Sequence, residues 1–365
     1  MSFKNIIGQK RVVSIIKRAI TSNRTPHALL FHGAEGLGKE AVAVELAKAL
    51  FCQQDPVYCD VCSDCKRVQQ LTHPDLLLIY PSPKQPKPEE VQTVRKSIID
   101  NPYFRAKLWS NPSILIDTIR GLKKTVSMTS YENKGRVIII MDAHRMTTEA
   151  ANSLLKVLEE PSGKLTMILI SSQSNLLLST IVSRCQKIRF DPIAWVDIEA
   201  ALIERELIPA ERARILARMS FGSYRRALEL LDEDLNEKQD LMIDVLRKLL
   251  TTDLDVALTV EYLVNNEDKK TIKELMGLMM VWFRDAMVLS ITTNEDYSDG
   301  GIINFDRLDT LQKFVQNLEP IDFQQVISSI EKAIELIDRN VYINLVLLQL
   351  FFKLKENLRR KINVR

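Results

Sequence analysis

The sequence predicts an α/β domain with a parallel sheet, followed by a long region that is entirely helical. Three observations predict this fold class. Short apolar segments alternate with helical patterns over about the first 190 residues, a glycine-rich loop joins one such segment to a helix, and strand-like segments stop after Phe190. Buried strands separated by helices are typical of a parallel sheet with helical crossovers.

The predicted strands are short, apolar and of the buried type. They are HALLFHG (27–33), DLLLIY (75–80), RVIIIM (136–141) and TMILIS (166–171). The first runs through the glycine loop into KEAVAVELAKALF (39–51), where apolar residues recur at helical spacing. A strand, a glycine loop and a helix in this order form the context that a phosphate-binding loop requires.

Region 81–113 interrupts the alternation of strands and helices. The segment PSPKQPKP (81–88) continues neither a strand nor a helix, because proline fixes φ and removes a hydrogen-bond donor. Together with NPYFRAKLWSNPS (101–113), it predicts an insertion at the periphery of the sheet. Two interpretations stay open: a flexible surface excursion, or a partner-docking loop that uses Tyr103, Phe104 and Trp109.

After Phe190 the patterns are helical, with a helix boundary at Gly222-Ser223. We therefore expect three parts: residues 1–190, a small helical part at 191–240, and a larger helical part at 241–365. Within the last part, NEDYSDGG (294–301) predicts an exposed loop, and the final helical pair is expected to break near Asn340.

Composition indicates an ordinary soluble protein. The 365 residues are 46% hydrophobic and 27% charged, and the formal net charge of +3 is too small to indicate nucleic-acid binding by bulk electrostatics. No apolar run approaches the roughly 18 residues of a membrane helix, and the first residues lack the apolar core of a signal peptide. We expect a cytoplasmic protein, in which clustered cysteines indicate metal before disulfides.

Four cysteines fall within one short window, 52–65, and predict a zinc module. Cys52, Cys59, Cys62 and Cys65 have the spacing of four thiolates around a tetrahedral Zn²⁺ ion. An iron–sulfur cluster fits the spacing too, and free buried thiols are the third interpretation. A closed four-thiolate site leaves no open position for catalysis, so we expect a structural role.

The loop FHGAEGLGKEAV (31–42) predicts a degenerate nucleotide site. Its candidate phosphate-binding residues are Gly33, Gly36, Gly38 and Lys39. Glu40 stands where a serine or threonine hydroxyl would hold Mg²⁺. A glutamate at a helix N-terminus also simply favours the helix dipole. The loop thus keeps its phosphate-binding groups, and ATP or ADP binding is expected to be weak or absent.

The strand that should complete a hydrolytic site also departs from the pattern. In RVIIIMDAHRM, Met141 precedes Asp142, where an active site usually presents two adjacent carboxylates. Asp142 alone also suits a helix-capping or surface role. Because Glu40 and Met141 are independent departures, we predict that the chain does not turn over ATP by itself.

Arg184 follows a short apolar helix near the end of the α/β part. A solvated residue or an ion-pair partner is the common role for such an arginine. An arginine supplied in trans to a γ-phosphate stabilises the charge that develops in the transition state. Position alone leaves both roles open.

Several motifs together resemble the delta-prime family of bacterial DNA polymerase III clamp-loader subunits, which are AAA+ proteins. They are IIGQ (6–9), HALLFHGAEGLGKE, the cysteine set, THPDLLLI, AANSLLKVLEEP (150–161), SRC (183–185) and GSYRRAL (222–228). The match covers roughly residues 1–230. The resemblance implies an AAA+ domain with a zinc module, then a helical lid and a helical collar that serves oligomerisation.

The resemblance implies a subunit of a five-membered loader that opens the sliding clamp and places it on primed DNA. Its partners would be the gamma/tau and delta subunits, and gamma/tau would hydrolyse ATP. Arg184 would be the trans arginine finger, Arg225 would match the second sensor of active members, and the cysteines would hold the zinc. Region 81–113 looks longer than the family's usual connection and receives no role.

Two other functions compete with this one. An autonomous gamma/tau-type ATPase motor would need a hydroxyl at position 40 and paired carboxylates at 141–142. A zinc-bearing DNA reader would need basic, aromatic-rich flanks around the cysteines, whereas CDVCSDC (59–65) carries acids. We expect no intrinsic catalysis and an accessory role in the polymerase holoenzyme.

Overall fold

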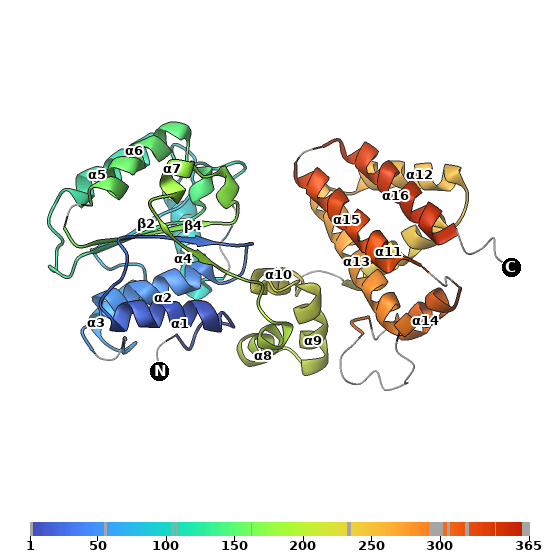
Figure 1. Ribbon diagram of the computed structural model, residues 1–365, viewed down its shortest axis with the longest axis horizontal. Helices are drawn as coiled ribbons and strands as arrows, with labels where there is room; N and C mark the ends of the chain where they lie inside the picture. Colours follow the sequence, from blue (N-terminus) through green and yellow to red (C-terminus); the bar gives the residue numbers. More distant parts are fainter. Residues whose placement is uncertain are drawn as a thin grey trace. The chain divides into compact units, whose positions relative to one another are not determined.

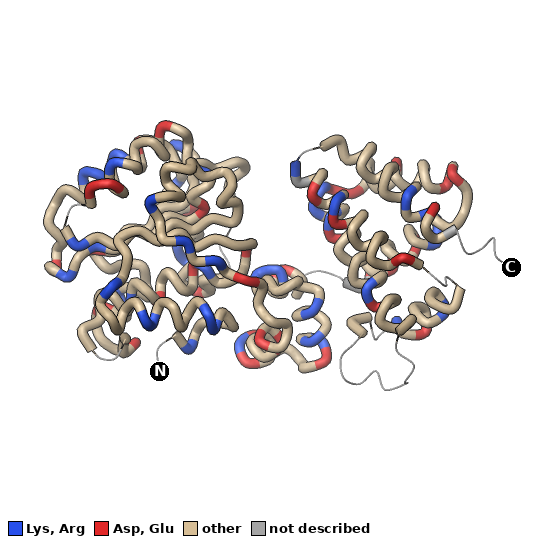
Figure 2. Tube along the Cα trace, viewed as in Figure 1, with Lys and Arg blue, Asp and Glu red and all other residues tan. Residues whose placement is uncertain are grey.

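The computed structural model describes residues 3–54, 57–103, 106, 108–161, 163–231, 235–291, 302–304, 307–317, 321–339 and 341–359. The chain divides into two compact units, residues 1–228 and 229–365 (Figure 1). The division into 1–190, 191–240 and 241–365 stays a prediction. Basic and acidic residues are interspersed along the helices of both units (Figure 2), in keeping with the small net charge.

A five-stranded parallel sheet forms the centre of the first unit. Its strands lie in the order β2-β3-β4-β1-β5 and are β1 (Ala28–His32), β2 (Leu76–Ile79), β3 (Arg136–Ile140), β4 (Leu165–Ser171) and β5 (Gln186–Arg189). The predicted strands and their parallel pairing are confirmed. The prediction lacked β5, because only Ile188 of its four residues is buried. Such a pattern is typical of an edge strand.

Helices cover both faces of this sheet (Figure 1). One apolar cluster joins one face to α1 (Lys10–Thr21), α2 (Lys39–Phe51), α3 (Ser63–Gln69) and α4 (Pro88–Asp100). A second cluster joins the other face to α5 (Ile116–Val126), α6 (Thr148–Glu159) and α7 (Ser179–Val182). Successive residues of β3 point to opposite faces and so belong to different clusters: Ile139 lies in the first and Ile140 in the second. A strand buried on both sides explains the continuous apolar run in its sequence.

The flexible-excursion interpretation of region 81–113 does not hold for residues 88–100, which form α4. Pro88 begins α4, and proline at a first helical position loses no helical hydrogen bond. Val94 and Ile98 of this helix are buried in the core. Trp109 Nε1 donates to the Glu90 carboxylate at 2.9 Å. Phe104 lies outside the described residues, and whether the region is an insertion stays a prediction.

Three helices complete the first unit: α8 (Trp195–Glu206), α9 (Ala210–Met219) and α10 (Tyr224–Glu229). They follow β5 and are joined to the sheet layer by main-chain hydrogen bonds. Tyr224 N–H donates to the Gly36 carbonyl at 3.1 Å, so α10 begins against the phosphate loop. Gly222 precedes α10 with φ of 81°, a conformation that glycine adopts without strain.

All regular elements in the described residues of the second unit are helices. Its helices are α11 (Leu235–Leu249), α12 (Asp253–Asn266), α13 (Lys269–Ile291), α14 (Leu308–Asn317), α15 (Phe323–Asp338) and α16 (Ile343–Arg359). Trp282 and Phe283 of α13 pack edge-on against Phe314 of α14. The predicted loop at 294–301 and the break near Asn340 fall outside the described residues. Among the described helices, none has the length and apolarity needed to cross a bilayer.

Candidate functional site

The phosphate loop lies between β1 and α2, in the context that its sequence predicts. Gly33, Gly36 and Gly38 all have positive φ, at 143°, 75° and 85°. A Cβ atom at Gly36 would lie 2.6 Å from Arg225 Cβ, and one at Gly38 would lie 2.7 Å from the Tyr103 ring. The glycines are therefore required both by backbone conformation and by close packing.

Lys39 is buried and bonded within the loop itself. Its Nζ donates to the Gly33 carbonyl at 2.9 Å and to the Ala34 carbonyl, and the residue is only 1% exposed. In a working phosphate loop this ammonium contacts the β- and γ-phosphates. Here the loop's own carbonyl oxygens occupy it.

The remaining candidate residues of the nucleotide site surround one small cavity. It is lined by Glu35, Gly36, Glu40, Ile98, Pro102, Tyr103, Met141, Asp142 and Arg225. The fold thus brings Glu40 and Met141, the two departures from the hydrolytic pattern, together with Arg225. Arg225 Nη1 lies 3.7 Å from Glu35 Oε2, and Met141 is fully buried. The residues that line this cavity include three carboxylates and one guanidinium.

This cavity is small in the structure. Its volume is about 20 Å³, close to the space that one water molecule needs. Pockets for small ligands typically measure about 300–1,000 Å³. The cavity beside the phosphate loop is therefore nearly closed.

Sequence reasoning missed the position of Tyr103 beside the phosphate loop. The sequence left this residue either in a flexible surface excursion or in a partner-docking loop, yet it is only 4% exposed and its ring packs on Gly38. Ile7 N–H donates to Tyr103 Oη at 2.7 Å, and burial raises the pKa of Tyr103 to about 12. The contacts join residues 96 positions apart in sequence, so no local pattern reveals them.

Arg184 and the phosphate loop lie at opposite ends of two neighbouring strands, β5 and β1. The loop follows the carboxyl end of β1, whereas Arg184 precedes the amino end of β5. The two strands are parallel, with Leu29 beside Gln186 and His32 beside Arg189. Because parallel strands point the same way, Arg184 cannot serve its own phosphate loop.

The four predicted zinc ligands converge. The sulfur atoms of Cys52, Cys59, Cys62 and Cys65 lie within 4.8 Å of one another, and none forms a disulfide. Cys52 Sγ lies 3.8 Å from Cys59 Sγ and 3.9 Å from Cys62 Sγ. Four sulfurs placed about 2.3 Å from a tetrahedral Zn²⁺ ion would be about 3.8 Å apart. The donor set and its spacing therefore fit zinc.

Local backbone geometry favours a thiolate in this cluster. Main-chain N–H groups of Val61 and Cys62 donate to the Cys59 sulfur and lower its pKa to about 7. Cys62 caps the start of α3, where its sulfur accepts from Cys65 N–H. Cys185 is buried in the other apolar cluster, and burial raises its pKa to about 11. It does not belong to the four-cysteine cluster.

Comparison with known proteins gives the family. The model of the family described as DNA polymerase III, delta subunit, matches residues 8–194, about half of the chain. The chain belongs to this family. The delta' subunit of Bacillus subtilis is 35% identical over 62% of this chain and 60% of its own length. The corresponding values for Pseudomonas aeruginosa delta' are 32%, 61% and 61%.

A gamma/tau subunit from Mycoplasma genitalium is also similar. It is 27% identical over 92% of this chain and 53% of its own length. This chain spans about three fifths of the length of the two delta' relatives named above. The family-level expectation drawn from the motifs is confirmed.

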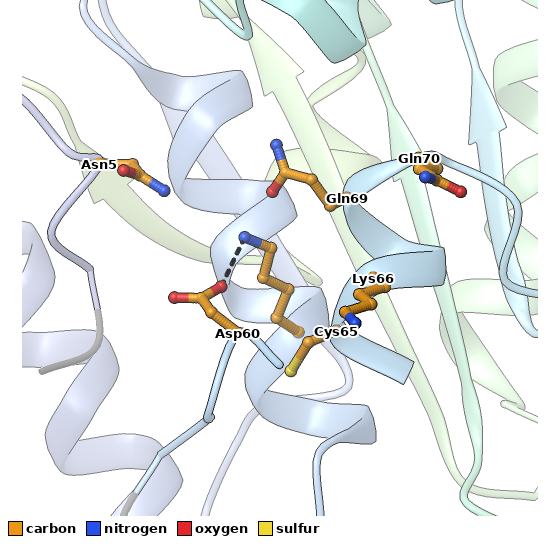
Figure 3. Close-up of a pocket in the computed structure, with 7 residues that line it drawn as sticks. Asn5, Asp60, Cys65, Lys66, Gln69 and Gln70 are labelled. Atoms are coloured by element: carbon orange, nitrogen blue, oxygen red, sulfur yellow. Dashed lines mark hydrogen bonds and ion pairs between the residues drawn. The ribbon is translucent and has the colours of Figure 1, made fainter. Parts of the chain in front are cut away.

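An ionic network links the four-cysteine segment to α2 in this delta-family chain. Lys48 Nζ lies 3.0 Å from Glu45 Oε1 and 2.9 Å from Asp60 Oδ1, and Tyr58 donates its hydroxyl to Glu45. The pair with Asp60 is the dashed line in Figure 3, in a pocket of about 380 Å³ that Cys65 also lines. Two carboxylates already neutralise the Lys48 ammonium, so this pocket does not present an unpaired positive charge to an anionic ligand.

A second cluster, Asp64, His73 and Glu132, resembles a metal site but does not fit one. Its ligand atoms lie within 4.8 Å of one another. His73 Nδ1 accepts from Asp75 N–H at 3.2 Å, and burial lowers the pKa of His73. The neutral ring then carries its proton on Nε2, the atom that faces the two carboxylates. A protonated nitrogen cannot ligate a metal.

Basic residues already neutralise the two carboxylates of this second cluster. Lys134 Nζ lies 2.5 Å from Asp64 Oδ2, and Arg67 lies within 2.6 Å of both Asp64 and Glu132. The cluster therefore links α3 to residues 132–134, which precede β3. Its charged pairs act as structural links.

Proposed function

We propose that this chain is the delta-prime subunit of a bacterial clamp loader and does not hydrolyse ATP. It would help assemble a pentameric loader with gamma/tau and delta subunits and load the sliding clamp onto primed DNA. Its relatives at 32% and 35% identity are delta' subunits, which supports this assignment. The same proposal includes a cytoplasmic location.

The loss of hydrolysis rests on the residues around the phosphate loop. Glu40 replaces the hydroxyl that would hold Mg²⁺, and buried Met141 replaces one of two carboxylates. Lys39 is engaged by the loop's carbonyls rather than directed at a ligand. Each change removes a different component of phosphoryl transfer, so the proposal does not depend on a single substitution.

The observation that carries the proposed role in trans is the location of Arg184. Its side chain is 37% exposed at the edge of the sheet away from its own loop. From there the guanidinium can approach a phosphate held by a neighbouring subunit, where it would stabilise transition-state charge. Arg225, at the closed loop, would have lost the sensor role of active family members.

Zinc is proposed to have a structural role. The four cysteines would hold Zn²⁺ in a closed tetrahedral site, and the ion would cross-link the end of α2 to α3. The proposed metal centre supplies folding stability and no chemistry. The network around Lys48 would transmit that rigidity to α2.

An ATPase motor of the gamma/tau type is the second candidate. It is favoured by one observation, the match to a gamma/tau subunit over 92% of the chain. A motor would hydrolyse ATP alone at rates near the low end for enzymes, about 1 s⁻¹. The closed loop and Met141 favour the delta-prime role instead.

One experiment separates the two candidates. The chain is purified alone and together with its organism's gamma/tau and delta subunits, and ATPase activity is measured with and without clamp and primed DNA. We expect co-purification of a complex, no turnover by the lone chain, and stimulated turnover by the complex. Mg²⁺-dependent hydrolysis by the lone chain, abolished by Lys39→Ala, would establish the motor instead.

A further inference from the structure

We propose that Tyr103 excludes nucleotide from the phosphate loop and itself bridges the loop to α10. This inference deepens the proposed function, since it extends a loss of hydrolysis to a loss of binding. It rests on that proposal only for the identity of the excluded ligand. Its test uses the chain alone, so it can fail while the clamp-loader role stands.

The first support is steric. The Tyr103 ring packs so closely on Gly38 that even a Cβ atom there would lie 2.7 Å from Cε1 and 3.0 Å from Oη. Tyr103 and Pro102 also line the cavity that Glu40, Asp142 and Arg225 share, and its volume of about 20 Å³ admits one water molecule. The ring thus occupies the side of the loop that faces the hydrolytic residues.

The second support is that three separate elements hold the ring in place. Ile7 N–H donates to its hydroxyl at 2.7 Å. Tyr224 of α10 packs against it edge-on, with ring centroids 5.2 Å apart at 75°. The third contact is Gly38 at the start of α2. Tyr103 is therefore fixed in position and joins the segment before α1, the phosphate loop and α10.

The third support is that α10 needs no nucleotide to be held at the loop. Tyr224 N–H donates to the Gly36 carbonyl, and Arg225 packs against Gly36 and pairs with Glu35. Tyrosine packing and direct loop contacts supply the bridge.

The test measures binding of a fluorescent ADP analogue to the purified full-length chain, with and without Mg²⁺. We expect no saturable binding by the wild type. Tyr103→Ala should bind the analogue saturably, with a dissociation constant at least tenfold below the highest concentration tested on the wild type. Adding Lys39→Ala to that variant should abolish the gain, since the ammonium becomes available only once the loop opens. Tyr131→Ala, at a tyrosine that is 77% exposed, is the matched control and should behave as the wild type.

Two further variants keep the test decisive. Tyr103→Phe keeps the ring and loses the hydroxyl, so it should still exclude the analogue. Tyr103→Leu fills part of the core while uncovering Gly38, so it should bind even if Tyr103→Ala does not fold. Near-ultraviolet circular dichroism checks folding. Saturable binding by the wild type, or no gain in a folded Tyr103→Ala or Tyr103→Leu chain, would overturn the inference.

Discussion

Arg184 and Glu159 form an ion pair at the edge of the sheet, with Nη2 2.7 Å from Oε1. Arg184 Nη1 also donates to the Thr180 carbonyl at 3.0 Å, so the guanidinium is held from two sides. Both side chains are partly exposed, and such surface pairs are typically worth only about 0–1 kcal/mol. The pair orients the arginine, and a pair this weak would yield to a phosphate of a neighbouring subunit if Arg184 has the proposed role in trans.

Replacing Arg184 with alanine should impair catalysis by the complex and leave the chain folded. A trans arginine contributes about 10³–10⁵ in rate at its site. Because the loader would have other ATP sites, we expect the clamp-stimulated ATPase to fall at least about threefold. The measurement is steady-state ATPase of the reconstituted complex, with complex formation checked by gel filtration.

Arg120→Ala is a matched control, since Arg120 is an exposed arginine paired with Asp117 on α5. It should leave the ATPase unchanged. Normal hydrolysis by an intact complex that contains Arg184→Ala would remove the trans role from this residue.

Glu159→Gln tests whether the ion pair orients Arg184 or restrains it. The substitution removes the charge and keeps the shape, so we expect the free energy of unfolding to change by less than about 1 kcal/mol. Clamp-stimulated ATPase should stay within about twofold of the wild type, because the phosphate replaces Glu159 as the partner. A loss as large as that of Arg184→Ala would make Glu159 an essential positioning residue.

The sequence predicted local features well and missed those made by distant residues. The strand that carries Leu30, the glycine loop and α2 follow from hydrophobic period and glycine placement. Tyr103 could not be found this way, because its contacts with Ile7 and Gly38 depend on the path of the chain around α4. The pairing of Arg184 with Glu159 was equally hidden, since it joins α6 to the end of α7.

Zinc content should depend on the cysteines and on no second site. Cys62→Ser removes one thiolate and the cap of α3, so we expect loss of about one equivalent of zinc and destabilisation of the first unit. His73→Gln should retain the zinc, because His73 is not one of the four cysteines that would hold it. Metal analysis after exhaustive dialysis measures both variants.

The two outcomes are independent. Unchanged metal in Cys62→Ser would exclude the four-thiolate centre. Loss of a metal ion from folded His73→Gln would instead show that the cluster with Asp64 and Glu132 holds one.

Asp285 should control the stability of the second unit. This carboxylate is fully buried on α13, and its Oδ2 accepts from Ile303 N–H, Asn304 N–H and Asn304 Nδ2 at 2.8–3.0 Å. Asp285→Ala would leave these donors without their acceptor, and we expect it to cost about 2–4 kcal/mol. Asp285→Asn keeps an oxygen acceptor and should cost less than Asp285→Ala.

The pH dependence gives a sharper test of the same residue. Burial raises the pKa of Asp285 above its ordinary value of 3.8, although the hydrogen bonds and Arg284 oppose the shift. A group whose pKa is higher in the folded state binds more protons there, so its contribution to stability grows as pH falls through the raised pKa toward 3.8. Asp285→Asn has no carboxyl group at this position and therefore lacks this pH-dependent contribution to stability. The wild type should therefore gain stability relative to Asp285→Asn on acidification over that window.

Urea unfolding at several pH values measures this difference. Trp282 is buried in the same unit and reports on it in a chain whose Trp109 and Trp195 are replaced by phenylalanine. Acid loss of stability elsewhere, for example from Glu132, whose pKa is lowered by its bond to Arg67, affects both chains alike and cancels in the comparison. A difference between the two chains that stays constant or shrinks on acidification would mean that Asp285 is not held in a raised-pKa state.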